Sequence, residues 1–198
     1  VEADMVVGVP ESGNPAAQGY AMESGIPYGT AFIKNSYVGR TFIKPKQSQR
    51  ESSVKIKLNV IEEVVRGKRI VMVDDSIVRG TQLRETVDFL YESGAKEVHM
   101  RSACPPIMYG CKYLNFSRSN SEMELIARRT VQNLEGDEGQ QHLDEYADGT
   151  TQRGKCMLKA ICEEMGFDSL GYQSLDGLLE AIGLDKDKVC TYCWNGKE

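Results

Sequence analysis

The feature that most constrains this chain is the run RIVMVDDSIVRGT at residues 69–81. Four consecutive apolar residues in it are typical of a strand buried on both faces, because a strand with one exposed face would alternate with polar residues. Two acids, Asp74 and Asp75, follow where such a strand leaves the sheet. The residues from Ser76 onward then predict a short loop that ends at Thr81, a good N-cap for a following helix.

This strand, loop and helix predict a binding site for a sugar phosphate. Backbone N–H groups of a tight loop, together with the positive end of a helix, bind a phosphate monoester. The carboxylates of Asp74 and Asp75 suit a ribose diol or a hydrated divalent cation. The alternative is that the two acids form an ordinary solvated turn after a core strand.

Length and charge narrow the class of protein. The 198 residues are enough for one α/β domain with a substantial core, and we expect no second full domain. A net charge of -5 argues against a nucleic-acid-binding surface. No apolar run approaches the roughly 18 residues of a membrane span, and no signal-peptide pattern is present, so we expect a cytoplasmic protein. Because Val1 is not an initiator methionine, we also expect a fragment of a longer chain.

The N-terminal residues predict a strand followed by a helix. Residues 4–10, DMVVGVP, are typical of a buried strand, and Asn14 followed by proline predicts a helix start whose end is marked by Gly25. In a parallel sheet, the loop after this strand lies beside the predicted phosphate site. Ser12 and Gly13 would offer a hydroxyl and backbone N–H groups there.

The rest of the chain predicts alternating strands and helices and one insertion. We expect strands at 28–33 and 96–103, and helices from 52 or 53 to 65 and at 81–93, 155–165 and 175–182. Such repetition implies right-handed crossovers and a mainly parallel sheet. Residues 34–53 are basic without apolar periodicity, which favours a long mobile loop. Residues 135–154 are polar and acidic and predict a disordered, solvated insertion, in which His142 has no identifiable partner.

These motifs resemble those of the type I phosphoribosyltransferases, whose motif for 5-phosphoribosyl-1-pyrophosphate (PRPP) is an apolar strand, two acids and a small-residue loop. DDSIVRGT, VPESG and YVGRTFI are similar to segments of the amidophosphoribosyltransferases of purine biosynthesis, and the resemblance covers most of the chain. It implies an α/β, type I phosphoribosyltransferase fold with a mainly parallel sheet flanked by helices and a helical, cysteine-bearing C-terminal extension. Residues 1–115 would form the core and 116–198 the extension, and the N-terminal glutaminase domain would be absent from this chain.

The resemblance also implies roles for individual residues. VPESG would meet pyrophosphate, with Glu11 where aspartate is usual, and YVGRTFI would be a lid that closes over PRPP. The lid would bring a cation to the leaving pyrophosphate from among Lys34, Arg40, Lys44 and Arg50. The catalytic residues would be Asp74, Asp75 and Arg40, and Mg²⁺ would be bound by Ser12, Asp74 and Asp75. The PRPP-binding residues would be Ser12, Gly13, Asp74, Asp75, Ser76, Ile77, Val78, Arg79, Gly80 and Thr81.

The C-terminal cysteines predict thiols or metal ligands rather than a disulfide framework. Cys190 and Cys193 form a C-x-x-C pair, which can place two thiolates on one metal but cannot complete a four-ligand site. From the residues alone, zinc, a redox dithiol and plain thiols remain open. The resemblance implies that Cys111, Cys190 and Cys193 bind a [4Fe-4S] cluster, with a fourth cysteine before Val1. The sequence ELIA at 124–127 is also shared with the family, but the sequence assigns it no role.

The function implied by the resemblance is the reaction of PRPP with ammonia, from glutamine in the full-length enzyme, to give 5-phosphoribosylamine and pyrophosphate. Mg²⁺ and the cluster would be the cofactors, purine nucleotides would be inhibitors, and the protein would be a homo-oligomer without nucleic-acid or membrane partners. Two alternatives are a purine or pyrimidine salvage phosphoribosyltransferase and a PRPP- or purine-sensing module without turnover. A salvage enzyme would have no reason to carry the C-terminal cysteines, and a sensing module would need no lid for the release of pyrophosphate.

Overall fold

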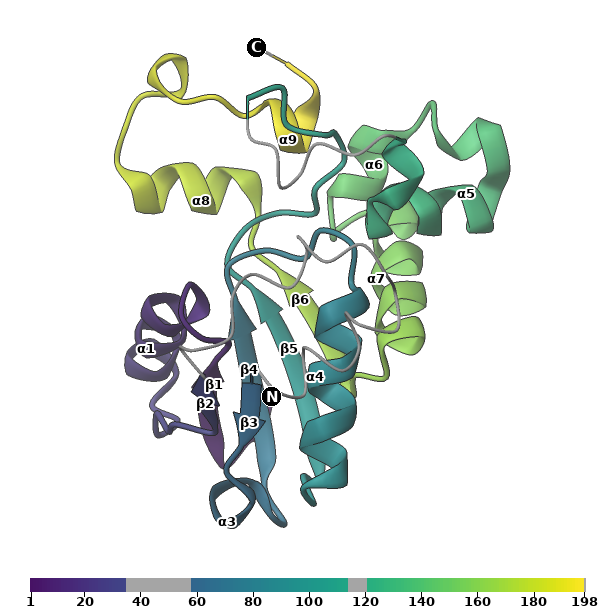
Figure 1. Cartoon of the computed structure of the whole chain (residues 1–198). Coiled ribbons are helices and arrows are strands. Elements are labelled where there is room, and N and C mark those ends of the chain that lie inside the picture. The colour runs from purple at the N-terminus through teal and green to yellow at the C-terminus, as the bar shows by residue number, and fades with distance from the viewer. Residues whose placement is uncertain (35–57, 114–120, 198) are drawn as a thin grey trace. The chain divides into compact units, whose positions relative to one another are not determined.

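A computed structural model describes residues 1–34, 58–113 and 121–197 of the chain (Figure 1). The predicted lid, with Arg40, Lys44 and Arg50, lies outside the described residues. The chain divides into two compact units, which are described separately. The first unit is Val1–Asp74 with Thr81–His99, and the second is Asp75–Gly80 with Met100–Glu198.

Two parallel strands, β1 (Met5–Gly8) and β4 (Arg69–Asp74), form the centre of the first unit. All of β1 is buried, and so is the apolar run of β4, as the sequence predicts. The helix α1 (Gly13–Ser24) packs on both strands, and Figure 1 shows it beside β1. The apolar cluster between them consists of Val6, Ala17, Ala21, Val71 and Val73.

An antiparallel pair, β2 (Phe32–Lys34) and β3 (Leu58–Val60), forms a separate two-stranded sheet. The prediction of a helix that ends at residue 65 is therefore wrong over residues 58–60. Only the last part of that predicted helix is helical among the described residues, as the short α3 (Glu62–Val65). Leu58 and Val60 flank Asn59, so their spacing also fits a strand, and pairing with β2 decides between the two. The strand predicted at 28–33 is shorter and later than expected, although Tyr28 forms an isolated bridge to Val6.

The next two elements agree with the prediction. The helix α4 (Thr81–Glu92) buries the face expected from its apolar spacing, and β5 (Glu97–Ser102) follows it. Between them Gly94 has φ 88°, in the left-handed region that glycine favours. A strand that the sequence did not predict, β6 (Ser169–Tyr172), ends the four-stranded sheet, whose order is β1-β4-β5-β6.

The second unit is mainly helical. The predicted helix at 175–182 has the expected bounds, because Ser174 accepts a hydrogen bond from Gly177 N (3.1 Å) and Gly183 ends it with φ 70°. The predicted helix at 155–165 begins three residues earlier, where the Thr151 hydroxyl accepts from Gly154 N (2.9 Å). The helical elements of the second unit are the 3-10 helix η2 (Glu122–Glu124), α5 (Ile126–Gly139, kinked at Gly136), α6 (Leu143–Ala147), α7 (Gln152–Met165), α8 (Leu175–Ile182), η3 (Lys186–Lys188) and α9 (Tyr192–Asn195).

The prediction of disorder over residues 135–154 is wrong. The segment completes α5, forms α6 and begins α7, and it buries Leu143 and Tyr146. His142 has a partner after all, since its Nδ1 lies 3.2 Å from Glu145 Oε1. Within the described residues, no helix is long and apolar enough to cross a membrane.

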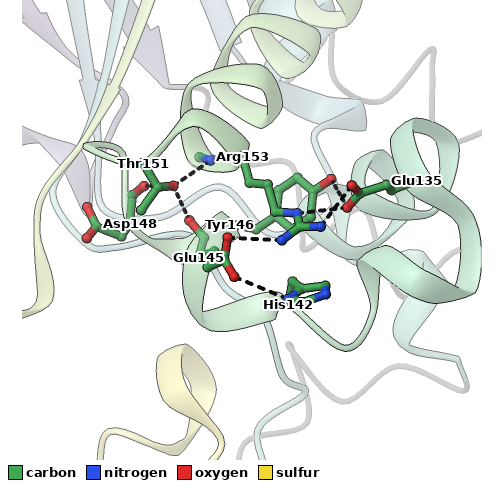
Figure 2. Close-up of polar contacts among 8 residues, drawn as sticks. Glu135, His142, Glu145, Tyr146, Asp148, Thr151 and Arg153 are labelled. Carbon is green, nitrogen blue, oxygen red and sulfur yellow. Dashed lines mark hydrogen bonds and ion pairs between the residues drawn. The ribbon is translucent and has the colours of Figure 1, made fainter.

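Arg153 at the start of α7 holds this segment together (Figure 2). Its guanidinium donates two hydrogen bonds to Glu135, at 2.9 and 3.0 Å, and one to Glu145 at 3.0 Å. The Tyr146 hydroxyl donates to the same Glu135 carboxylate (3.0 Å), and burial followed by this contact raises the pKa of Tyr146 to about 12. The hydrogen bonds from Arg153 lower the pKa of both glutamates. The guanidinium of Arg153 therefore joins α5, α6 and α7.

Replacing Arg153 tests this account. Because the folded-state pKa values of Glu135 and Glu145 are lowered, their stabilising effect is complete above the ordinary glutamate pKa of about 4.3 and is lost as the pH falls below it. We expect Arg153→Met to lower the melting temperature by about 2–4 °C at neutral pH. The difference in melting temperature between Arg153→Met and the unsubstituted protein should become smaller below about pH 4. Thermal unfolding across pH 3–7 measures this, with Lys155→Met on the same helix as control, and an equal loss at all pH values would contradict it.

Candidate functional site

The carboxyl ends of β1 and β4 lie side by side and position the loop that follows β1. Gly8 is opposite Val73 in the parallel register, and Val9 N donates to Val73 O (2.9 Å). At the start of α1, an ideal Cβ on Gly13 would lie 2.5 Å from Val73 O and 3.3 Å from Asp74 Oδ1. The backbone of α1 therefore approaches the end of β4 closely, and the two predicted site residues Gly13 and Asp74 are neighbours.

The helix start differs from the prediction in one respect. Ser12 rather than Asn14 is the N-cap of α1, and it has helical φ and ψ and no capping hydrogen bond from its side chain. Gly13 N donates to Val9 O (2.9 Å), four residues earlier, so a hydrogen bond with helical spacing already closes the loop between β1 and α1. The prediction that Gly25 ends the helix is confirmed, with φ 72° and a hydrogen bond to Ala21 O. Ser12 is exposed, as a ligand-binding hydroxyl needs to be.

Glu11, whose role the sequence left open, has a partner in the first unit. Its Oε2 lies 2.9 Å from the ammonium group of Lys34, one of the cations predicted to reach pyrophosphate. The peptide bond between Pro10 and Glu11 is cis. This ion pair fixes Lys34 beside the loop after β1.

The second unit contains the loop of the DDSIVRGT motif. The Asp75 carboxylate accepts a hydrogen bond from Ser76 N (2.7 Å), which closes the first turn of the loop. Ile77 is buried and anchors the loop, whereas Arg79 is exposed. Gly80, with φ 80°, leads directly into α4, so Thr81 is the first residue of that helix rather than the residue before it. The loop therefore leads through Gly80 into a 12-residue helix, and its role in binding a phosphate stays a prediction.

Oxygen ligands suited to Mg²⁺ are present at these predicted positions. Carboxylates and hydroxyls are the donors that a hard divalent cation prefers. Asp74 is half-buried at the end of β4, Asp75 is exposed, and Ser12 is exposed in the first unit. Across residues 1–34, 58–113 and 121–197, no group of three His, Cys, Asp or Glu side chains is arranged to hold a metal ion. Binding of Mg²⁺ by Ser12, Asp74 and Asp75 therefore stays a prediction.

Two segments of the second unit that carry predicted cysteine ligands are joined by hydrogen bonds. The Cys193 carbonyl accepts hydrogen bonds from Met108 N (2.9 Å) and Tyr109 N (3.0 Å), which joins the C-terminal segment to the one that carries Cys111. Burial first, and then the neighbouring Cys111 and Cys190, together raise the pKa of the Cys193 thiol to about 11. The Cys193 thiol also shares a hydrogen bond with Cys111.

The other cysteines have different contacts or positions. Cys156 and Cys162 lie on α7, as predicted, and Cys104 Sγ donates to Pro105 O (3.3 Å). None of the six cysteines forms a disulfide. Among the described residues, no group of three His, Cys, Asp or Glu side chains is arranged to hold a metal ion, so the assignment of Cys111, Cys190 and Cys193 as cluster ligands stays a prediction.

Sequence reasoning missed the residues that support the DDSIVRGT loop. Ile126 N donates to Val78 O (2.8 Å), and Arg79 pairs with Glu124 at 2.6 Å. Both partners belong to the ELIA sequence at 124–127. The only signal for them was the likeness of that sequence to the family, because an ion pair between distant positions leaves no periodic pattern.

Comparisons with known proteins place these features in context. Residues 2–105 match the family described as phosphoribosyl transferase domain. The chain is 47% identical over 198 residues to amidophosphoribosyltransferase of Mycobacterium tuberculosis and 44% identical over 194 residues to that of Methanothermobacter thermautotrophicus. It covers 33% and 35% of these two relatives, which in turn match 100% and 98% of the chain. The chain therefore spans about a third of the length of the curated relatives it matches.

Solved structures agree with these relatives. The glutamine PRPP amidotransferase of B. subtilis, complexed with ADP and GMP, superimposes with a TM-score of 0.74 at 42% identity and covers all of this chain and 38% of its own. A structure described as the allosteric regulatory enzyme of purine biosynthesis gives a TM-score of 0.72 at 43% identity, again over all of this chain and over 37% of its own. The predicted fold, a type I phosphoribosyltransferase with a mainly parallel sheet flanked by helices, is confirmed.

Two glycines of α1 give a matched test of the close approach between α1 and β4. In Gly13→Ala the new methyl group would meet Val73 O, so α1 must shift, and we expect a loss of about 1–3 kcal/mol in the free energy of unfolding. Gly19 has no atom within 4 Å of its missing Cβ. Gly19→Ala should therefore stabilise the helix by roughly 0.5–1 kcal/mol. Urea unfolding measures both variants, and equal stability of the two would contradict the packing described.

Proposed function

This chain belongs to the phosphoribosyl transferase domain family, and we propose that it is the PRPP-binding, phosphoribosyl-transferring part of an amidophosphoribosyltransferase. The observation that carries the proposal is the DDSIVRGT loop at the end of β4, which precedes the N-terminus of α4 in a chain closely related to such enzymes over its whole length. The reaction would join ammonia, released from glutamine in the whole enzyme, to the ribose of PRPP. This is a step of purine biosynthesis.

Each part of the site has a chemical task in this proposal. The backbone N–H groups from Ser76 to Thr81 would bind the 5-phosphate, aided by the positive end of α4. Asp74 and Asp75 would hold the ribose hydroxyls. Ser12 and Gly13 would contact the pyrophosphate, and Mg²⁺, when bound, would neutralise its charge. A bond would form between ammonia and C1 of ribose as the bond from C1 to pyrophosphate breaks.

Replacing either acid tests the proposal. Removal of one contact made in the transition state commonly costs about 2.7–4 kcal/mol, so Asp74→Asn and Asp75→Asn should each lower turnover by about two orders of magnitude or more. Pyrophosphate release from PRPP in the presence of Mg²⁺ and ammonium measures it. Asp88→Asn on the outer face of α4 makes the same change in charge and should leave turnover unaltered.

Two outcomes of that assay would point elsewhere. Near-normal turnover in either acid variant would refute the assignment of the site. Binding of PRPP without release of pyrophosphate by the unsubstituted protein would favour the sensing module instead. A salvage phosphoribosyltransferase would use a purine or pyrimidine base in place of ammonium, which the same assay can supply.

The cysteines support a second part of the proposal, that Cys111, Cys190 and Cys193 bind a [4Fe-4S] cluster in the intact protein. The thiol of Cys193 already contacts Cys111, and Cys190 is near enough to raise its pKa. Three thiolates on two segments would tie the C-terminal residues to residues 108–111, where the Cys193 carbonyl is bound. The role would be structural, because the reaction transfers no electrons.

Iron and sulfide analysis tests the cluster. The full-length protein, purified without oxygen, should contain about four iron atoms and four sulfides per chain, the content of a [4Fe-4S] cluster. Cys193→Ser should lose most of both. Cys156→Ser, at an exposed position of α7, should keep them. Retention of iron by the Cys193 variant, or its absence from the unsubstituted protein, would contradict the proposal.

The remaining expectations concern inhibitors, the oligomeric state, the cellular location and Arg40. Because the B. subtilis relative was solved with ADP and GMP, we propose that purine nucleotides bind this protein and inhibit it. A homo-oligomeric state, a cytoplasmic location and the catalytic role of Arg40 remain predictions.

A further inference from the structure

From the contacts of residues 124–127 we infer that this ELIA segment is a support that holds the phosphate loop, residues 76–80, in its binding geometry, with Glu124 as a positioning residue. The effect on PRPP rests on the function proposed above, whereas the effect on the loop does not. Both segments belong to the second unit of the chain. Three separate contacts carry the inference.

The first contact is between backbone groups. Ile126 is the first residue of α5, and its N–H is one of those that have no partner within a helix. It donates to Val78 O in the middle of the phosphate loop (2.8 Å). This hydrogen bond satisfies the helix start and fixes the orientation of the loop peptide. Leu125, Ile126 and Ala127 are each at most 1% exposed, so the donor is part of a rigid core.

The second contact is apolar packing beneath the end of the loop. Gly80 is buried, and an ideal Cβ there would lie 2.7 Å from Ile126 Cδ1 and 3.0 Å from Met165 Sδ. The loop backbone therefore rests directly on the side chains of α5 and α7. Only glycine combines this close approach with φ 80°.

The third contact is the ion pair between Arg79 and Glu124, at 2.6 Å. Arg79 lies between the two anchored positions Val78 and Gly80, so the pair holds the exposed side of the same short loop. Glu124 itself sits on a fixed element, because Glu122 of η2 pairs at 2.5 Å with the largely buried Arg128. Arg79 is thus held toward η2 by a side-chain contact that involves none of the backbone N–H groups of the loop.

A loop held in place before its ligand arrives binds with a smaller loss of conformational freedom. Removing the Glu124 carboxylate should therefore weaken substrate binding and leave the chemical step alone. If Arg79 instead bound the phosphate in competition with Glu124, removal of the carboxylate would tighten binding. The direction of the change separates the two roles.

The binding test compares three variants of the full-length protein. Glu124→Ala should raise the dissociation constant and the KM for PRPP by about three- to fivefold, the size expected for a partly exposed ion pair, with kcat almost unchanged. Glu124→Gln keeps an acceptor for Arg79 and should show a smaller rise. Glu163→Ala, which removes an exposed acid from α7, should behave like the unsubstituted protein. Unchanged or tighter binding by Glu124→Ala, or an equal effect of Glu163→Ala, would overturn the inference.

A second measurement is independent of the proposed function. Hydrogen exchange of the amides in residues 75–81 without ligand should be faster in Glu124→Ala than in the unsubstituted protein and in Glu163→Ala. Equal exchange would overturn the support role even if PRPP binds. If the unsubstituted protein fails to bind PRPP while exchange rises in Glu124→Ala, the proposed function is wrong and the support role of the segment stands.

Discussion

The candidate site depends on the parallel pairing of β1 with β4. The register that puts Gly8 opposite Val73 makes the two strands end together, and Val9 N continues the pairing onto Val73 O. The loop after β1 then starts at the same edge of the sheet as Asp74, the last residue of β4. The absence of a side chain at Gly13 lets α1 begin against Asp74. A one-residue slip of this register would offset the two strand ends and move Gly13 away from Val73 O, so the same pairing specifies the strand contacts and the position of the loop.

Local signals explain why much of this fold could be predicted from the sequence. The apolar run of β4 is buried because it lies in the interior of a parallel sheet, and such runs need no information from distant residues. The helix α8 has its predicted ends because Ser174 and Gly183 act on their own neighbours. The positions of Asp74 and Asp75 followed from the strand that precedes them. In each case the decisive interaction lies within a few residues of the signal.

The failed predictions involve partners far away along the chain. Leu58 and Val60 fit a helical or an extended pattern equally well, and Phe32 of β2 selects the extended one. The acidic segment 135–154 appears disordered by composition because its many charges look solvated, yet Arg153 neutralises Glu135 and Glu145 and lets Tyr146 be buried. Composition counts charges without showing which of them are paired. The same limit hid the pairing of Arg79 with Glu124.

The start of α5 links the phosphate loop with the cysteine segments of the second unit. Ile126 N binds the loop at Val78, and two residues later Arg128 donates to Met108 O (3.1 Å) and lies over the ring of Tyr109. The backbone of Met108 and Tyr109 in turn binds the Cys193 carbonyl. One turn of helix thus contacts both segments through groups that are buried and hydrogen-bonded. A buried guanidinium without acceptors would be costly, and Arg128 finds them in Met108 O, Gln140 Oε1 and Glu122, which lies on the element that carries Glu124. The start of α5 therefore joins the phosphate loop to the segment of Met108 and Tyr109, and that segment in turn binds the C-terminal residues.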